Sequence, residues 1–341
     1  MLSPRADPDR ASGGGTSSQH GLPLHAERAN ATLNRLQLVI TRRLDGLLQG
    51  DYLGLLPGPG SEAGESREYR PGDDVRRMDW PVTARTTVAH VRRTIADREL
   101  ETWLAVDLSA SLDFGSAGSL KRDLAIAAAA SVAHLTVRGG NRIGAVVSDG
   151  QSLVRLPARS GRTEAQGLLR AIARTESVSA DSSRLRGSQA RSSRSQLPGR
   201  TDLGALIDTL NRPPRRRGLA AVISDFMAPP AQWARPLRKL AVRHDVLAIE
   251  IVDPRELELT DVGVLAVADP ETGVVHEIQT SDRRLRERFA AAATKERAAV
   301  ATAIRGAGAA HLRLRTDSDW LLDIVKFVAA ARHAKTRGTT R

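Results

Sequence analysis

The sequence contains no cysteine, which excludes disulfides, thiolate-bound zinc, iron–sulfur clusters and a cysteine nucleophile. It also lacks a long hydrophobic run. The longest candidate, Leu124–Val137, falls short of the roughly 18–20 apolar residues that span a bilayer. The first residues, Met1–His20, are polar and have no apolar stretch of the kind a signal peptide needs. We therefore expect a cytoplasmic protein with no membrane span.

Aromatic residues make up only 3% of the chain, although its formal net charge is +12. Arginine is spread through the whole sequence, and its two densest clusters, Arg184–Arg200 and Arg212–Arg217, lack the aromatic residues that stack on single-stranded bases. A basic nucleic-acid-binding protein remains an alternative interpretation. We expect no nucleic acid partner, and a weak contact with an acidic protein surface fits this charge distribution better.

The 41% hydrophobic content of the 341 residues is enough to build a substantial core. From residue 101 onward, apolar strands alternate with amphipathic helices, a pattern typical of a doubly wound, mostly parallel α/β sheet. We therefore predict an α/β fold, Rossmann-like in its winding, with an N-terminal helix and a β-rich extension. The expected divisions are a disordered N-terminus over 1–25, a helix and β-rich region over 26–100, an α/β domain over 101–333 with a flexible insertion at 176–199, and a disordered tail over 334–341.

Hydrophobic periodicity predicts the individual elements. The expected strands are Val88–Ile95, Trp103–Asp107, Arg142–Ser148, Ser152–Leu156, Leu219–Asp225, Asp245–Val252 and His311–Arg315, with a hairpin of Val264–Val267 and Val274–Ile278. The expected helices are Ala26–Leu48, Leu120–Val137, Thr163–Thr175, Thr201–Leu210, Pro230–Val242, Ser281–Ile304 and Asp319–Ala331.

A D-x-S-x-S run follows the first strand of the α/β region directly, as Asp107, Ser109 and Ser111. Ligands bind at the carboxyl ends of strands in such sheets, so this run can direct one carboxylate and two hydroxyls to a common point. Thr201 and Asp225 are suitably placed to add further oxygen atoms from later loops. Hard oxygen ligands of this kind suit Mg²⁺ or Mn²⁺. The alternative is that Asp107, Ser109 and Asp225 only satisfy backbone groups of their own loops.

This oxygen-rich set resembles the metal-ion-dependent adhesion site of von Willebrand factor A-type domains. The resemblance assigns the D-x-S-x-S motif to Asp107, Ser109 and Ser111, the threonine ligand to Thr201, and the second aspartate to Asp225. It implies that an acidic residue of a client protein completes the metal shell.

A second motif lies upstream, in a tight turn that alternates arginine and aspartate. Its residues are Arg70, Gly72, Asp73, Asp74, Arg76, Asp79, Trp80 and Arg85. Arginine–carboxylate pairs could lock this segment structurally, or the segment could dock a partner. The two motifs together resemble the DUF58 family, over roughly residues 45–260. The resemblance implies an adaptor or co-chaperone partner of a MoxR-type AAA+ ATPase in the assembly or maturation of protein complexes.

Sequence signatures of catalysis are missing. The chain has neither a G-x-x-x-x-G-K-[ST] phosphate-binding loop nor a G-x-S-x-G nucleophile elbow. A Mg²⁺-dependent hydrolase or phosphotransferase with Asp107 as nucleophile would need a second acid two residues on, where Ser109 stands. We therefore expect a metal-dependent protein-interaction module that binds rather than catalyses.

Overall fold

The structure, a computed structural model, describes residues 40, 66–69, 75, 78–92, 101–116, 119–138, 140–175, 202–212, 218–268 and 274–338. The expected disordered N-terminus and the expected insertion at 176–199 lie outside these residues. Of the expected helix Ala26–Leu48, the described part is Ile40, which is helical and buried in the main core.

Six strands form the central sheet. Their order is β5 (Leu153–Arg159), β4 (Arg142–Ser148), β3 (Glu101–Asp107), β6 (Gly218–Ser224), β7 (Asp245–Val252) and β10 (Ala310–Arg315). All neighbours in this sheet pair in parallel except β4 and β5, which form an antiparallel hairpin at one edge. The predicted doubly wound, mostly parallel α/β sheet is confirmed.

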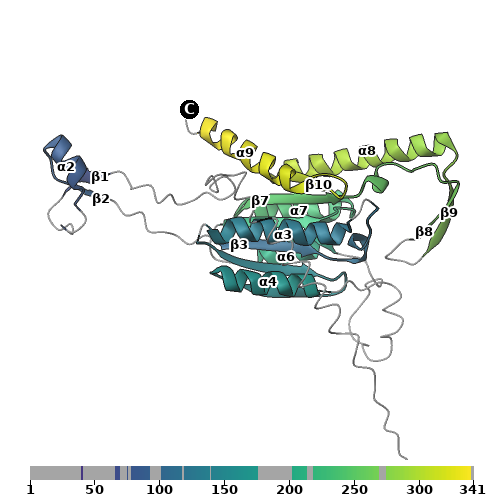
Figure 1. Cartoon of the computed structure of the whole chain (residues 1–341), viewed down its shortest axis with the longest axis horizontal. Coiled ribbons are helices and arrows are strands. Elements are labelled where there is room, and N and C mark those ends of the chain that lie inside the picture. Colours follow the sequence, from purple (N-terminus) through teal and green to yellow (C-terminus); the bar gives the residue numbers. More distant parts are fainter. Residues whose placement is uncertain are drawn as a thin grey trace, which may run out of the picture.

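Helices cover both faces of this sheet (Figure 1). One face packs against α3 (Lys121–Arg138), α4 (Arg162–Arg174) and α9 (Trp320–Gly338), and the other against α6 (Leu203–Asn211), α7 (Pro230–Ala241) and α8 (Arg283–Gly306). Helix α9 continues to Gly338, past residue 333, where a disordered tail was expected to begin.

The central strand β3 shows why the sheet is covered on both sides. Leu104 and Val106 point into the core under α3, while Trp103 and Ala105 point into the core under α6 and α7. Successive side chains of a strand face opposite sides, so a strand with four consecutive apolar residues, Trp103–Val106, must be buried on both faces. Burial of each large apolar side chain stabilises the fold by roughly 1.5–3 kcal/mol.

The chain also has smaller elements outside the six-stranded sheet. The predicted hairpin is present as β8 (Val264–Ala268) and β9 (Val275–Gln279), which lies beside one end of α8 (Figure 1). Strands β1 (Ser66–Glu68) and β2 (His90–Arg92) pair in antiparallel fashion, with helix α2 (Trp80–Thr86) between them in sequence. Two single turns of 3₁₀ helix, η3 (Ala110–Leu112) and η4 (Pro254–Glu256), follow β3 and β7. Within the described residues, none of the helices has the length and apolar character needed to cross a membrane.

The strand order reverses between β3 and β6. From β3 the chain first adds β4 and β5 on one side, and then returns to add β6, β7 and β10 on the other. Because β3 and β6 are parallel neighbours with Val106 opposite Ile223, their carboxyl ends lie side by side. Such a switch point is where open α/β sheets bind their ligands, and it positions Asp107 beside the Ser224–Asp225 pair.

Candidate functional site

Asp107, the last residue of β3, lies at the centre of the candidate site. Its side chain is almost fully enclosed, with 2% of the residue exposed. Its Oδ1 accepts a hydrogen bond of 3.1 Å from the backbone N–H of Ser109, and its Oδ2 accepts one of 2.9 Å from the hydroxyl of Ser224. These bonds orient the carboxylate at the adjacent ends of β3 and β6.

The two predicted hydroxyl groups lie next to this carboxylate. Ser109 caps the turn η3 and is buried, while Ser111 lies within that turn and is partly exposed. Their Oγ atoms are 3.2 Å apart, and the Ser111 side chain also hydrogen-bonds the carboxylate of Asp225. The structure therefore brings together four of the five predicted ligands, namely Asp107, Ser109, Ser111 and Asp225.

Asp225 follows β6 and is also buried. Its Oδ1 accepts a 3.2 Å hydrogen bond from the backbone N–H of Met227, and its Oδ2 lies 2.9 Å from the ammonium of Lys121. Lys121 in turn contacts Glu256, which also pairs with Arg297 at 3.0 Å. This chain of ion pairs joins the loops after β3, β6 and β7 to helix α8.

Lys121, Glu256 and Arg297 were not predicted as part of the site. Lys121 opens α3, and a cation at a helix N-terminus opposes the helix dipole. A lysine at this unfavourable position in the sequence could have indicated that an acidic side chain elsewhere in the chain pairs with it. Glu256 belongs to a capping box with Asp253, a pattern that its sequence context, Asp253–Pro254–Arg255–Glu256, displays.

The two aspartates of the site have opposite pKa shifts. Burial and the nearby Asp225 carboxylate raise the pKa of Asp107 to about 6, against the hydrogen bonds from Ser109 and Ser224 that lower it. For Asp225, burial alone would raise the pKa, but the charge and hydrogen bond of Lys121 outweigh burial and lower it. Asp225 is therefore the firmly ionised member of the pair, and Asp107 is the member whose charge is poorly compensated.

The fifth predicted ligand, Thr201, lies outside the described residues. The structure does correct the start of the helix that Thr201 was expected to open, because α6 begins at Leu203 and its N-cap is Asp202. The Asp202 carboxylate accepts a 2.8 Å hydrogen bond from the backbone N–H of Ala205. An aspartate is at least as good an N-cap as a threonine, which is why the N-cap is Asp202, one residue later than predicted.

The second motif is described in part. Arg70, Gly72, Asp73, Asp74 and Arg76 lie outside the described residues. Asp79 is buried and caps α2, where its carboxylate accepts hydrogen bonds from the Ser66 hydroxyl at 2.6 Å and from the Val82 N–H at 3.4 Å. Trp80 and Arg85, by contrast, are exposed on α2.

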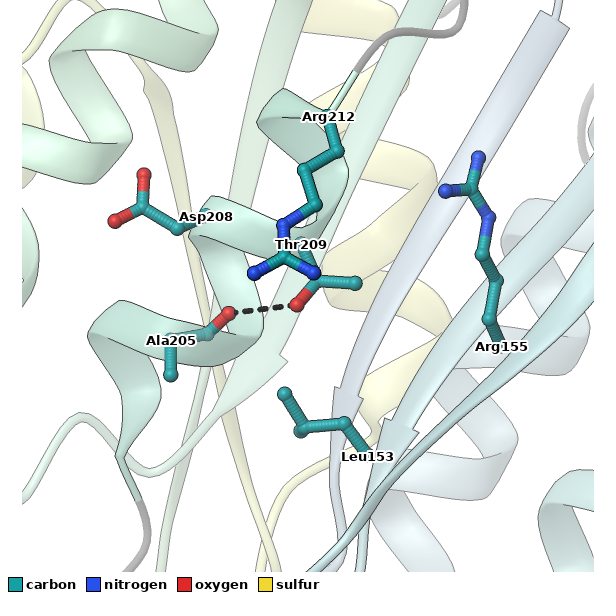
Figure 2. A pocket seen from close by; sticks show the side chains of 6 residues that line it. All are labelled: Leu153, Arg155, Ala205, Asp208, Thr209 and Arg212. Atoms are coloured by element: carbon teal, nitrogen blue, oxygen red, sulfur yellow. Dashed lines mark hydrogen bonds between the residues drawn. The ribbon is translucent and has the colours of Figure 1, made fainter.

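A pocket of about 510 Å³ lies elsewhere, between the edge strand β5 and helix α6 (Figure 2). Leu153 and Arg155 line it from β5, Asp208 and Thr209 line it from α6, and Arg212 lines it from just after α6. Arg155 also lies over the ring of Trp103, at 4.8 Å from the centroid. None of the four predicted metal ligands that the structure describes lines this pocket, so it is separate from the site that they form at the switch point.

The chemistry of the donors at the switch point fits Mg²⁺ or Mn²⁺. Two carboxylates and two hydroxyls supply hard oxygen atoms, which these ions prefer. Within the described residues there is no group of three or more histidine, cysteine, aspartate or glutamate side chains that could hold a metal. A bound ion would complete its shell with water, as Mg²⁺ commonly does, and the raised pKa of Asp107 marks a carboxylate that a cation would stabilise.

A doubly wound sheet with a D-x-S-x-S cluster at its switch point defines a von Willebrand factor A-like α/β protein. The chain belongs to the DUF58 family, because the sequence model of that family, described as "Protein of unknown function DUF58", matches residues 65–299. Uncharacterized proteins of Mycobacterium bovis and Mycobacterium tuberculosis are each 55% identical over 308 residues, which cover 90% of this chain and 91% of theirs.

Solved structures with similar folds were also found. BatB from Bacteroides thetaiotaomicron is 16% identical, covers 68% of this chain and 98% of its own, and superposes with a TM-score of 0.38. A von Willebrand factor type A protein from Catenulispora acidiphila is 12% identical, covers 72% of this chain and 44% of its own, and gives a TM-score of 0.36. The family membership predicted from the two motifs is confirmed by the match of the DUF58 sequence model to residues 65–299.

Proposed function

We propose that the carboxyl edge of the sheet is a Mg²⁺- or Mn²⁺-dependent docking surface for an acidic side chain of a client protein. The observation that carries this proposal is the convergence of Asp107, Ser109, Ser111 and Asp225 at the switch point. When bound, the metal ion supplies a positive charge to which a carboxylate of the client is attracted. The four side chains of this protein hold and orient the ion.

Charge supports the choice of an acidic client. The two hydroxyl ligands are neutral, and Lys121 already pairs with the Asp225 carboxylate. A divalent cation in these surroundings would keep an excess of positive charge. In a partly enclosed site, where the effective dielectric constant is lower than in water, that excess strongly favours an incoming anion.

Exposed apolar side chains near the site support a protein as the ligand. Phe114, Leu120 and Met227 are all exposed. Phe114 and Leu120 belong to the loop that leads into α3, where the backbone N–H of Lys121 donates a 2.8 Å hydrogen bond to the Phe114 carbonyl. The sulfur of Met227 accepts from Arg297 at 3.1 Å. Phenylalanine and methionine are among the residues enriched at protein–protein interfaces.

We further propose that the protein acts as an adaptor or co-chaperone of a MoxR-type AAA+ ATPase in the assembly or maturation of other protein complexes. Membership in the DUF58 family is the support for this partner. The segment around Trp80 and Arg85, both exposed on α2, is the candidate surface for that contact.

In this proposal the site binds rather than catalyses. An aspartate nucleophile such as Asp107 would need a second acid two residues on, and that residue is Ser109. The Asp107 carboxylate is also enclosed by hydrogen bonds from Ser109 and Ser224. Turnover of a phosphate ester that depends on Mg²⁺ and on Asp107 would contradict this part of the proposal.

The metal dependence is tested by isothermal titration of Mg²⁺ into the wild-type chain, the S109A variant and the S160A variant. Ser160 is an exposed serine in the loop between β5 and α4, and it serves as the matched control. We expect binding by the wild type and S160A, and a loss of at least tenfold in affinity for S109A. Equal affinity of all three proteins, or no binding by the wild type, would overturn the metal site.

The partner is tested by co-precipitation with a purified MoxR-type ATPase from the same organism, in Mg²⁺ and in EDTA. We expect retention of the ATPase by the wild type. Loss of retention in EDTA and in D107A would place the contact at the metal site. Retention that survives both changes would show that the ATPase binds elsewhere on the chain.

A further inference from the structure

Lys121 provides a buried positive charge inside the candidate metal site. Its side chain is 1% exposed, and its ammonium lies 2.9 Å from Asp225 Oδ2 and in direct contact with Glu256 Oε1. A buried ammonium is stable only when it is paired and hydrogen-bonded. The two carboxylates meet this need and raise the pKa of Lys121, although burial alone would lower it.

This ammonium contacts the same carboxylate that a divalent ion would use. Of the two oxygens of Asp225, Oδ1 accepts the backbone N–H of Met227 and Oδ2 contacts Lys121. The side chain of Ser111, a predicted metal ligand, hydrogen-bonds the same carboxylate. Lys121 and a metal ion at Ser111 would therefore be neighbours that share Asp225.

The balance of charge shows what Lys121 does to a bound ion. Asp107 and Asp225 together carry two negative charges when ionised, and Lys121 neutralises one of them. The remaining ion pairs of the cluster balance, because Glu256 pairs with Arg297 and Glu250, which also contacts Arg297, pairs with Arg313. Without Lys121, a divalent ion would leave the aspartate pair neutral. With Lys121, it leaves the cluster with one net positive charge, and a carboxylate of a client can neutralise that charge.

We infer that Lys121 is the resident cation of this site: it competes with the divalent ion for Asp225 and leaves the loaded site with a net positive charge. This inference rests on the proposed metal-dependent docking. Lys121 therefore acts on the metal indirectly, through Asp225, and weakens metal binding in the absence of a client. It also makes the client's carboxylate part of what holds the metal in place.

The test is isothermal titration of Mg²⁺ alone, at pH 8 and low salt, into the wild type and the K121M and K239M variants. Methionine keeps much of the length of the lysine chain and removes its charge. Lys239 is an exposed lysine on α7, and K239M controls for the loss of one positive charge from the whole protein. We expect K121M to bind Mg²⁺ at least tenfold more tightly than the wild type, because a like charge a few ångströms away has been removed. K239M is expected to match the wild type.

The outcomes separate this inference from the proposed function. Tighter binding by K121M than by a wild type that itself binds Mg²⁺ supports the inference. Binding by K121M alone would show that Lys121 excludes the metal from the native chain, which overturns both the proposed docking and the inference that rests on it. Binding by the wild type with no gain in K121M would overturn the inference and leave the proposed function intact. No binding by either protein would overturn both.

A second variant guards against misfolding, since K121M leaves Asp225 and Glu256 without their shared cation. The double variant K121M/E256Q removes one of these carboxylates together with the ammonium. It is compared with E256Q, which keeps Lys121. Tighter Mg²⁺ binding by the double variant than by E256Q supports the inference, and equal or weaker binding by the double variant overturns it.

Discussion

The hydroxyl of Ser224, at the end of β6, donates a 2.9 Å hydrogen bond to Oδ2 of Asp107, at the end of β3. Both side chains are buried, and the bond crosses the point where the strand order reverses. The Oγ of Ser224 also accepts a 3.1 Å hydrogen bond from the backbone N–H of Phe226. Ser224 therefore ties the carboxylate of one loop to the backbone of the next.

Replacement of Ser224 by alanine should weaken both the fold and the metal site. The buried Asp107 carboxylate loses a donor that lowers its pKa, so that pKa should rise further. We expect the free energy of unfolding to fall by about 1–2 kcal/mol, the usual cost of an unsatisfied buried acceptor. Urea denaturation measures this change. Ser131→Ala is the control, because Ser131 is equally buried and its hydroxyl donates to the Ala127 carbonyl of its own helix. A similar loss in both variants would contradict a special role for Ser224.

The raised pKa of Asp107 predicts how stability depends on pH when no divalent ion is present. Its contribution to stability is fully present below its unfolded value of 3.8 and is lost as the pH rises through about 6. Asp107→Asn should therefore be more stable than the wild type at pH 8, by about 1–3 kcal/mol, and similar to it near pH 4. Thermal unfolding in EDTA at the two pH values measures this difference.

Asp225→Asn is the matched comparison, and its effect should have the opposite sign. The pKa of Asp225 is lowered, so its contribution to stability is present at neutral pH and is lost as the pH falls. We expect this variant to be less stable than the wild type at pH 8. If both asparagine variants changed stability in the same direction at pH 8, the assignment of different charge environments to Asp107 and Asp225 would be wrong.

The sheet and the D-x-S-x-S part of the site could be predicted because each is encoded in a short, continuous stretch of sequence. Strand β3 is apolar at most positions and ends in Asp107, and the D-x-S-x-S run is continuous in the sequence. Placement of Asp225 beside it required only the general rule that parallel strands bring their carboxyl ends to one edge. The register of Val106 opposite Ile223 fulfils that rule.

The ion pairs of the site could not be predicted, because they join residues far apart in the chain. Lys121 and Glu256 are separated by 135 positions, and no periodicity in either segment indicates the other. The start of α6 was misplaced for a different reason, since Thr201 and Asp202 are both good N-caps and only the fold selects Asp202. Helix α2 was missed although Asp79 and the proline at its first turn mark a helix start.

Gly204 in α6 should tolerate no side chain. A Cβ atom there would lie 2.5 Å from the backbone oxygen of Gln232 in α7, closer than real Cβ contacts allow, so the two helices would have to separate. We expect Gly204→Ala to reduce the free energy of unfolding by about 1–3 kcal/mol. The control is Gly167→Ala in α4, where a Cβ meets nothing within 4 Å, and it should stabilise the protein by up to about 1 kcal/mol. Equal effects in urea denaturation would contradict the close packing of α6 on α7.

Asp79 and Trp80 of the second motif should have different roles, Asp79 in the structure of α2 and Trp80 in docking a partner. Asp79 caps α2 and accepts the hydroxyl of Ser66, so Asp79→Ala should speed hydrogen exchange at the α2 amides through loss of both contacts, worth about 1 kcal/mol or more. Trp80 is 66% exposed, so Trp80→Ala should leave exchange in α2 unchanged. Because a large exposed aromatic side chain is a typical anchor for a partner, we expect Trp80→Ala to reduce retention of the ATPase. Normal retention by Trp80→Ala would remove α2 as the docking surface, and unchanged exchange in Asp79→Ala would show that this carboxylate does not lock the segment.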